Sequence, residues 1–214
     1  MDRRTCHSPR GLDTQKKTLG ATERDEQHRA DYRQRIARRT AADFVIVDEC
    51  GSNINLTPIY ARAPRGERAH GTVPRNTEAN TTLIASMSTA GMGAAFVLTG
   101  ATNAAAFVVY LEQILGPTLP PGKVVVLDNL RAHKDKRVRA AIEARGCELW
   151  YLPPYSPDLS PIEEAFAKLK NLLRRAAART REALLDAIAA ALDHITATDA
   201  QGFFQHCGYQ VAAQ

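Results

Sequence analysis

The sequence predicts an α/β protein built on one mixed sheet. In its first half, short apolar runs are separated by turn residues, a pattern typical of antiparallel strands. After Gly100, apolar strands alternate with amphipathic helices, which is typical of parallel pairing. With 214 residues, 44% of them hydrophobic, the chain can bury one sizeable core. We therefore expect a single α/β domain with an appendage.

Four strands are predicted in the first half, over residues 43–49, 56–62, 81–88 and 94–99. Residues 64–66, Pro-Arg-Gly, indicate a turn, and a polar stretch follows to about Ala79. Residues 91–93, Gly-Met-Gly, predict a hairpin between the last two strands. These first strands are expected to pair antiparallel.

Helices and strands alternate in the second half. Asn103 is suited to cap a helix that runs to about Leu115 and ends at Gly116-Pro117. The further predicted elements are a strand over 123–128, a helix over 132–145 that stops at Gly146, a strand over 147–152, and helices over 161–177 and 181–195. Parallel pairing is expected for the strands of this half.

The positive charge is concentrated in the N-terminal segment. The net charge is +5, and residues 1–40 hold 11 Lys/Arg against 6 Asp/Glu, whereas residues 41–214 hold 17 of each. A basic arm suits a phosphate backbone, which binds Lys and Arg with release of counterions. The alternative, which composition alone favours, is a solvated, partly helical linker.

Several features indicate a cytosolic setting, with a bacterial one as the default. No stretch approaches the roughly 20 apolar residues of a membrane span. The N-terminus is charged without a following apolar run, so a secretory signal is not expected. The four cysteines are scattered without a C-x-x-C pair, which favours reduced thiols over a disulfide framework or a zinc knuckle.

Three carboxylates occupy positions where burial would be costly. Asp48 ends the apolar run 44–47, Asp128 ends the run 124–127, and Glu163 opens the helix that follows a proline-rich loop. An unpaired buried carboxylate is destabilising unless it is protonated or meets a cation, so these acids suggest a divalent metal site. If the two strands are neighbours, their acids meet at one sheet edge, and the stiff loop presets the approach of Glu163. Phosphoryl-transfer chemistry is the expected use.

Each of these acids also has a purely structural interpretation. Glu163 lies three residues after Ser160 and could complete a capping box. Asp128 could instead form a turn and cap the following helix. The neighbouring acids are weaker ligand candidates: Glu49, which should point to the opposite side of its strand, Glu164, and Asp158, which suits an Asx-type turn.

Three sequence blocks resemble the DDE catalytic domain of mariner-type insertion-sequence transposases. They are residues 45–49 (Val-Ile-Val-Asp-Glu), residues 125–129 (Val-Val-Leu-Asp-Asn) with His133 downstream, and residues 151–163 (Tyr-Leu-Pro-Pro-Tyr-Ser-Pro-Asp-Leu-Ser-Pro-Ile-Glu). The 34 residues between Asp128 and Glu163 match the spacing of that superfamily. The third block is highly specific, and the resemblance covers about residues 41–209.

The resemblance implies a ribonuclease H-like fold, in which a mixed sheet of three antiparallel strands and then parallel strands is flanked by helices. It implies two Mg²⁺ or Mn²⁺ ions held by Asp48, Asp128 and Glu163 as catalytic residues. The reaction would be cleavage of double-stranded DNA at element ends and strand transfer into a target, commonly at a short TA-containing site. The implied partners are element-end and target DNA, and a second copy or a DNA-binding transposase part, at the bacterial nucleoid.

Candidate DNA contacts come from basic residues near the acids. The family often has a histidine at the position of His133, which could contact phosphate or orient the acid; a surface histidine is the alternative. Lys134, Lys170 and Arg174 lie in basic strips that could face DNA. Charge on the outer face of a helix more often serves solvation, and this interpretation stays open.

Residues 1–40 are interpreted as an arm left after a missing DNA-binding domain, and residues 41–214 as the DDE catalytic domain. Full-length relatives carry N-terminal helix-turn-helix domains, so the chain would be a catalytic half, from a split or frameshifted reading frame or a decayed remnant. One rival hypothesis is a stand-alone ribonuclease H-type nuclease, and another is a non-catalytic regulator of a full-length transposase. A glycosidase is disfavoured by the single Trp and 6% aromatic residues.

Overall fold

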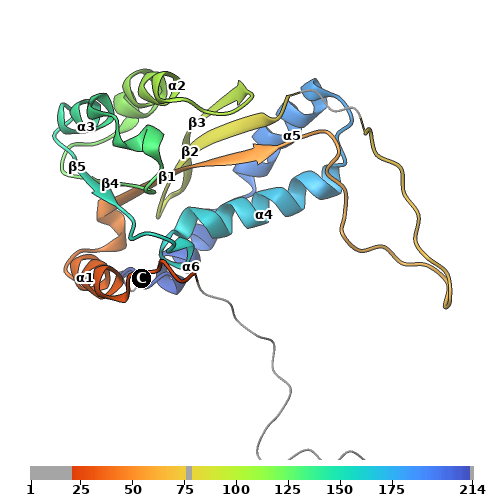
Figure 1. Ribbon diagram of the computed structural model, residues 1–214, viewed down its shortest axis with the longest axis horizontal. Helices are drawn as coiled ribbons and strands as arrows, with labels where there is room; N and C mark the ends of the chain where they lie inside the picture. The colour runs from red at the N-terminus through yellow and green to blue at the C-terminus, as the bar shows by residue number, and fades with distance from the viewer. Residues whose placement is uncertain (1–20, 76–78, 213–214) are drawn as a thin grey trace, which may run out of the picture.

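The computed structural model describes residues 21–75 and 79–212, and its centre is a five-stranded mixed sheet (Figure 1). The strands are β1 (Phe44–Ser52), β2 (Thr81–Ser88), β3 (Gly91–Thr99), β4 (Val124–Leu127) and β5 (Glu148–Tyr151). Their order is β3-β2-β1-β4-β5. The first three strands pair antiparallel, whereas β1 with β4 and β4 with β5 pair parallel, which confirms the predicted mixed sheet.

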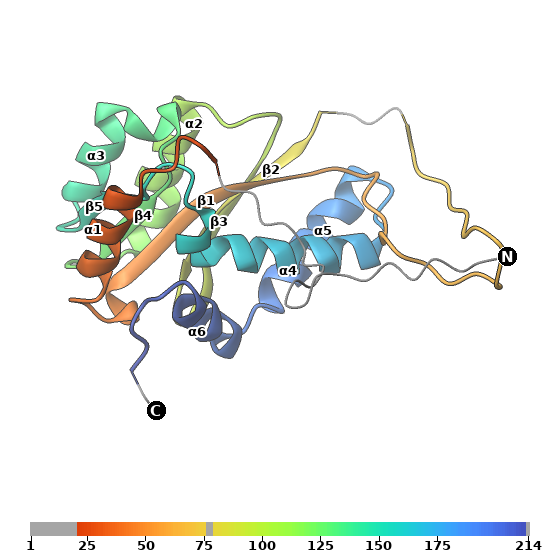
Figure 2. The same cartoon turned by 60° about the horizontal axis from the view of Figure 1, so that its bottom comes forward.

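Helices cover both faces of this sheet (Figure 2). The α-helices are α1 (Glu26–Ile36), α2 (Ala104–Val109), α3 (Lys136–Glu143), α4 (Pro161–Ala176), α5 (Arg181–Asp193) and α6 (Ala197–His206). Shorter helical turns are η1 (Ala41–Asp43), the π-helical η2 (Tyr110–Leu115), η3 (Gly116–Thr118), η4 (Arg131–Lys134) and η5 (Pro157–Leu159). In the part of the chain that the structure describes, no helix has the length and apolarity needed to cross a membrane.

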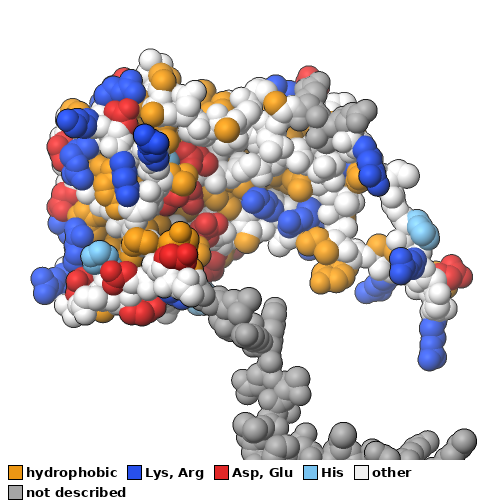
Figure 3. All heavy atoms as spheres, in the orientation of Figure 1, with side chains coloured by type: hydrophobic (Ala, Val, Ile, Leu, Met, Phe, Trp, Pro, Cys, Tyr) orange, Lys and Arg blue, Asp and Glu red, His pale blue; other side chains and the backbone are white. Residues whose placement is uncertain are grey.

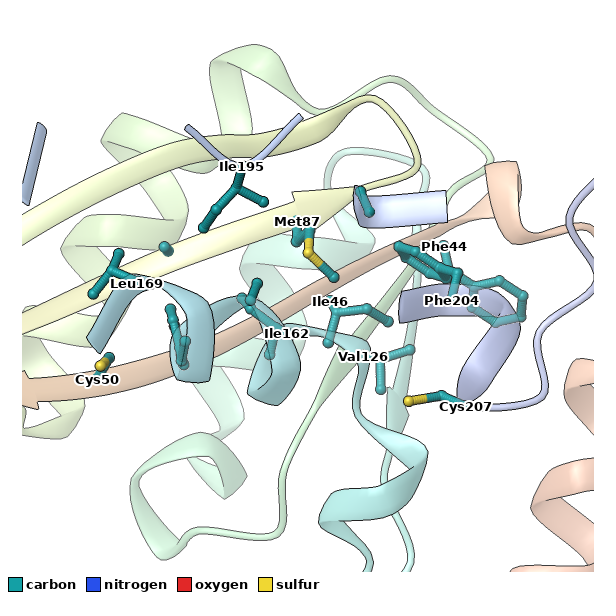
Figure 4. Packing of buried hydrophobic residues seen from close by; sticks show 14 of the residues in the cluster. Phe44, Ile46, Cys50, Met87, Val126, Ile162, Leu169, Ile195, Phe204 and Cys207 are labelled. Atoms are coloured by element: carbon teal, nitrogen blue, oxygen red, sulfur yellow. The ribbon is translucent and has the colours of Figure 1, made fainter. Parts of the chain in front are cut away.

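Alternation along β1 divides its side chains between two hydrophobic cores. Phe44 and Ile46 join the larger core, which also contains buried residues of α1, α4, α5 and α6 (Figure 4). Val45 and Val47 join the core that packs against α2 and α3. Because successive strand residues face opposite sides, Asp48 belongs to the α4 side of the sheet.

The helices of the second half form largely as predicted. Asn103 caps α2 by accepting a hydrogen bond from the N–H of Ala106 at 2.9 Å, and the helix continues through η2 to Leu115. The predicted helix over 132–145 is split, because Asp135 caps a new start by accepting from the N–H of Arg137. Gly146 follows this helix with φ +69°, as expected of a stop residue.

The predicted strand over residues 56–62 is wrong. The described part of the connection between β1 and β2 contains no strand, and it reaches away from the sheet (Figure 1). Ile59 and Tyr60 are 69% and 89% exposed. A strand requires backbone partners, and β2 already occupies the antiparallel position beside β1. The predicted turn at residues 64–66 does form, with Gly66 at φ +90°.

The predicted hairpin is confirmed, but its turn lies earlier than residues 91–93. Thr89 and Ala90 make the turn, and Gly91 begins β3 with φ +117°. A Cβ at Gly91 would also lie 3.1 Å from the carbonyl oxygen of Ile195. Gly91 is therefore needed both for its backbone conformation and for close packing.

Two helices lie outside the predicted elements. α1 belongs to the segment interpreted as an arm, yet its Tyr32 and Ile36 are buried in the larger core, so packing begins before residue 41. The part of the basic arm over residues 1–20 lies outside the described residues. α6 was missed, although Thr196 and Asp199 form a capping box that marks its start.

Candidate active site

Strand register brings Asp48 and Asp128 to one edge of the sheet. In the parallel pair, Ile46 is opposite Val126, and each acid lies two residues further along its strand direction. The two acids therefore share an edge and a face. A pocket of about 450 Å³ opens at this edge and is lined by Asp48, Asp128 and Glu163 together with residues 129, 130, 152–157 and 160.

Glu163 reaches this pocket from the first turn of α4. The loop before the helix is stiff, since η5 is closed by the N–H of Ser160 donating to the carbonyl of Pro157 at 2.9 Å. The Ser160 side chain caps nothing: its hydroxyl is buried and has no hydrogen-bond partner among the described residues. The capping box, the structural alternative for Glu163, is therefore not formed.

The carboxyl group of Asp48 has a pKa raised to about 7. Burial is the largest cause, followed in the opposite direction by the N–H of Glu49, which donates to Asp48 Oδ1 at 2.7 Å. The negative charges of Asp128 and Glu163 raise this pKa further. The pocket thus concentrates more negative charge than the protein neutralises there, which favours a bound cation.

The residues of the pocket suit a hard divalent ion. Carboxylate oxygens are the ligands that Mg²⁺ and Mn²⁺ prefer, and the unpartnered Ser160 hydroxyl leaves a further oxygen in the pocket lining. Within the described ranges, no three His, Cys, Asp or Glu side chains already stand in an ion-binding arrangement.

The ring of His133 lies between the carboxylates of Asp128 and Glu49. Its ring is fully buried, with Nδ1 2.5 Å from Asp128 Oδ1 and Nε2 3.1 Å from Glu49 Oε1. Burial lowers the pKa of His133, but the hydrogen bonds to both carboxylates outweigh it and raise the pKa to about 9. At neutral pH the ring is therefore an imidazolium that donates to both acids.

This geometry decides between the interpretations of His133. The surface-histidine interpretation is wrong, and a direct phosphate contact does not fit a fully buried ring. Orientation of Asp128 is the alternative that the contacts support. Asp128 also accepts from the N–H of Leu130 at 3.0 Å, so its turn-forming role coexists with its place in the pocket, while Asp135 caps α3.

The other nearby acids have partners of their own. Glu49 points away from Asp48, as alternation predicted, but its link to His133 was missed. Glu164 contacts the ring of His206. Asp158 was interpreted as a turn former, whereas the structure pairs its carboxylate with arginines of the N-terminal segment.

The candidate basic residues lie on two elements: Lys170 and Arg174 on α4, and Lys134 at the end of η4. Lys170 and Arg174 come seven and eleven residues after Glu163, a spacing that places all three on one face of α4. Figure 3 shows acidic side chains near the start of this helix and basic ones over its middle. Lys134 is exposed at the end of η4. Lys170 and Arg174 therefore extend the face of α4 that begins at Glu163.

The sheet order, the two helical layers and the acids at the ends of β1 and β4 define the class: a domain of ribonuclease H-like fold with an acidic pocket at the sheet edge. A family model, described as DDE superfamily endonuclease, matches residues 43–185, and the chain belongs to this family. No match was found among curated proteins.

Solved structures of the mariner transposase Mos1 share the fold. The Mos1 transposase paired-end complex with left transposon end has a TM-score of 0.73 at 18% identity, over 93% of this chain and 64% of that one. The mariner Mos1 paired-end complex with Mg gives 0.65 at 18%, over 93% and 65%. The Mos1 catalytic domain with raltegravir and Mg gives 0.54 at 15%, over 86% and 90%.

These comparisons confirm the predicted resemblance at the level of family and fold. At such identities the structures establish the ribonuclease H-like fold. The chain spans less than two thirds of the Mos1 chains in the paired-end complexes.

Proposed function

We propose that this chain is the catalytic domain of a transposase that cleaves DNA at the ends of an insertion sequence and joins them to target DNA. The observation that carries the proposal is the convergence of Asp48, Asp128 and Glu163, from three separate elements, on one pocket. Membership of the DDE endonuclease family supports phosphodiester chemistry there. In this proposal residues 41–214 are the catalytic domain, and helix α1 packs against it through Tyr32 and Ile36.

The three acids would hold two Mg²⁺ or Mn²⁺ ions. Such ions activate an attacking water or 3′-hydroxyl and stabilise the leaving oxygen of an in-line displacement at phosphorus. Asp48 would release its proton on ion binding, because a cation stabilises the ionised carboxylate against the burial and the neighbouring negative charges that raise its pKa. The His133 imidazolium orients Asp128, and the stiff loop before α4 presents Glu163. These contacts restrain the positions of two of the three acids, which is part of the preorganisation that metal-dependent catalysis needs.

The proposed substrate is double-stranded DNA, with element ends and target as its two forms. Lys170 and Arg174 continue the face of α4 that begins with Glu163, and Lys134 adds an exposed positive charge at the end of η4. The Mos1 structures, which contain paired transposon ends, provide the precedent for such a substrate and for a paired assembly. We place the protein at the bacterial nucleoid, as a homodimer or with a DNA-binding transposase part.

The test is nicking of supercoiled plasmid DNA in Mn²⁺, with Asp48→Asn, Asp128→Asn and Glu163→Gln as matched variants checked for folding by circular dichroism. We expect nicking by the parent protein and its loss in all three variants. Addition of precleaved element-end DNA should then yield joined products. Cleavage of RNA–DNA hybrids without joining would instead identify a stand-alone nuclease. Nicking that persists in the folded variants would refute the proposed site.

A further inference from the structure

Asp158 connects the N-terminal helix to the turn that precedes Glu163. Arg29 of α1 donates to both carboxylate oxygens of Asp158, with Nη1 at 3.0 Å from Oδ1 and Nη2 at 2.7 Å from Oδ2. Arg24 adds a third hydrogen bond, from Nη2 to Oδ1 at 2.7 Å. This geometry is the bidentate form of the arginine–carboxylate pair, which restrains orientation as well as distance.

The burial of this pair is asymmetric. The Arg29 side chain is 2% exposed, whereas that of Asp158 is 50% exposed. An arginine is seldom buried unless it is paired, so the buried position of Arg29 depends on acidic partners. Asp158 is the partner that forms the bidentate ion pair. Glu26 lies further out on the same helix, with Oε2 3.3 Å from Arg29 Nε.

A second line of contacts holds the same turn from the C-terminal segment. The hydroxyl of Tyr209 donates to the carbonyl of Leu159 at 3.1 Å, and the hydroxyls of Tyr32 and Tyr209 lie 2.8 Å apart. Both tyrosines are buried. Residues that are far apart in sequence thus converge on η5, the single helical turn over Pro157–Leu159.

The path from this turn to Glu163 is short and stiff. The N–H of Ser160 donates to Pro157 at 2.9 Å, and the N–H of Glu163 donates to Ser160 at 3.1 Å. Pro157 and Pro161 fix two φ angles within the same stretch. A displacement of Asp158 is therefore transmitted to the start of α4 rather than absorbed by the loop.

We propose that Arg29 is a positioning residue of the acidic pocket: through Asp158, helix α1 sets where Glu163 stands, and so couples whatever precedes α1 to metal binding. The inference deepens the proposed function and rests on its metal site. It makes residues 24–36 part of the catalytic unit rather than of a passive linker. A DNA-binding part attached ahead of α1 would then act on the pocket through the Arg29–Asp158 pair.

The test compares Arg29→Met, which keeps most of the side-chain volume, Asp158→Asn, and the double variant. Arg38→Ala, which removes an exposed arginine from the same segment, is the matched control. The measured quantity is the Mn²⁺ dissociation constant, obtained from the free-ion signal in electron paramagnetic resonance without DNA. Asp48→Asn identifies the binding that belongs to the pocket.

Docking of α1 can be followed separately through Trp150, the only tryptophan in the chain. The guanidinium carbon of Arg35 lies 3.8 Å from its ring centroid, and the Tyr32 ring packs edge-on at 6.4 Å. Undocking of α1 would expose this indole and shift its emission to longer wavelength. Unchanged emission in a variant therefore shows that α1 is still in place and that only the ion pair has changed.

We expect each single variant to weaken Mn²⁺ binding about tenfold, the lower end of the range for outer partners of metal ligands, because Asp158 acts at a distance. The double variant should bind Mn²⁺ as tightly as the single variant with the lower affinity, since both changes remove the same ion pair. Arg38→Ala should match the parent protein.

The inference is overturned if either folded single variant binds Mn²⁺ with the affinity of the parent protein. It is also overturned if the losses of affinity in the two single variants add up in the double variant. If Arg29→Met does not fold, the half-exposed Asp158→Asn still decides. The inference is also overturned if the parent protein shows no Mn²⁺ binding that is lost in Asp48→Asn. A parent protein that binds Mn²⁺ in this way but fails to nick or join DNA contradicts the proposed function alone.

Discussion

The buried bridge Asp128–His133–Glu49 makes the stability of the protein depend on pH. We consider His133→Gln, which removes the charge but keeps a side chain able to hydrogen bond at the same place. In the parent protein the ring donates to Asp128 at 2.5 Å and to Glu49 at 3.1 Å only as long as both nitrogens are protonated. Loss of the proton leaves two carboxylates facing a neutral ring.

The magnitude follows from the two pKa values of His133. Its pKa is about 9 in the folded protein against 6.5 for an unperturbed histidine. A raised folded-state pKa contributes stability that is fully present below pH 6.5 and is lost as pH rises through 9. The difference corresponds to about 3 kcal/mol of the free energy of unfolding.

The assay is urea denaturation of the metal-free protein at intervals from pH 6 to pH 10, with the same series for His133→Gln. Subtraction of the two profiles removes the titration of groups that both proteins share. We expect the stability advantage of the parent protein to shrink by about 3 kcal/mol across this window. His194→Gln, at an exposed histidine, is the control and should follow the parent. A difference profile that is flat between pH 6 and pH 10 would refute the assigned bridge.

Three further predictions concern metal binding, packing and DNA. Mn²⁺ affinity should fall about tenfold per unit as pH drops below 7, the pKa of Asp48, because the proton competes with the ion; titration calorimetry with a pH-independent result would contradict this. Leu169→Ala, in the larger core, should lower the free energy of unfolding by about 2–5 kcal/mol in urea melts, whereas Leu130→Ala, 51% exposed, should cost far less; equal losses would be inconsistent with the packing. The pair Lys170→Ala and Arg174→Ala should weaken DNA binding and flatten its salt dependence by about two counterions, and an unchanged slope in anisotropy titrations would remove these residues from the DNA surface.

The fold was predictable where the local sequence pattern matches what the surrounding tertiary structure allows. The apolar run 44–47 predicted a buried strand, and β1 does lie between the two cores. Asn103 and Gly146 marked helix ends through their own side chain or backbone. The run at 56–62 shows the limit of this reasoning. Its composition suits a strand, but strand formation depends on a free neighbouring edge, and β2 holds the edge beside β1.

The same distinction applies to the site. The positions of Asp48, Asp128 and Glu163 follow from strand ends and a proline-fixed helix start, which are local features, and the structure places all three around one pocket. Glu49 was assigned to the far side of its strand by alternation. Its partner there could not be read from the chain, because 84 positions separate it from His133.

The sequence by itself therefore determined the five strands of the sheet and most of the helices of the second half, since each depends on residues within a few positions of one another. It misplaced a strand at residues 56–62 and missed α6. Only the tertiary structure decided that His133 is buried between two carboxylates and that Arg29 holds Asp158 across 129 positions. Those pairings depend on which surfaces meet when α1 and the C-terminal segment pack against the sheet. A single sequence does not record that choice, because many arginines and acids could satisfy one another equally well until packing excludes water from one particular pair.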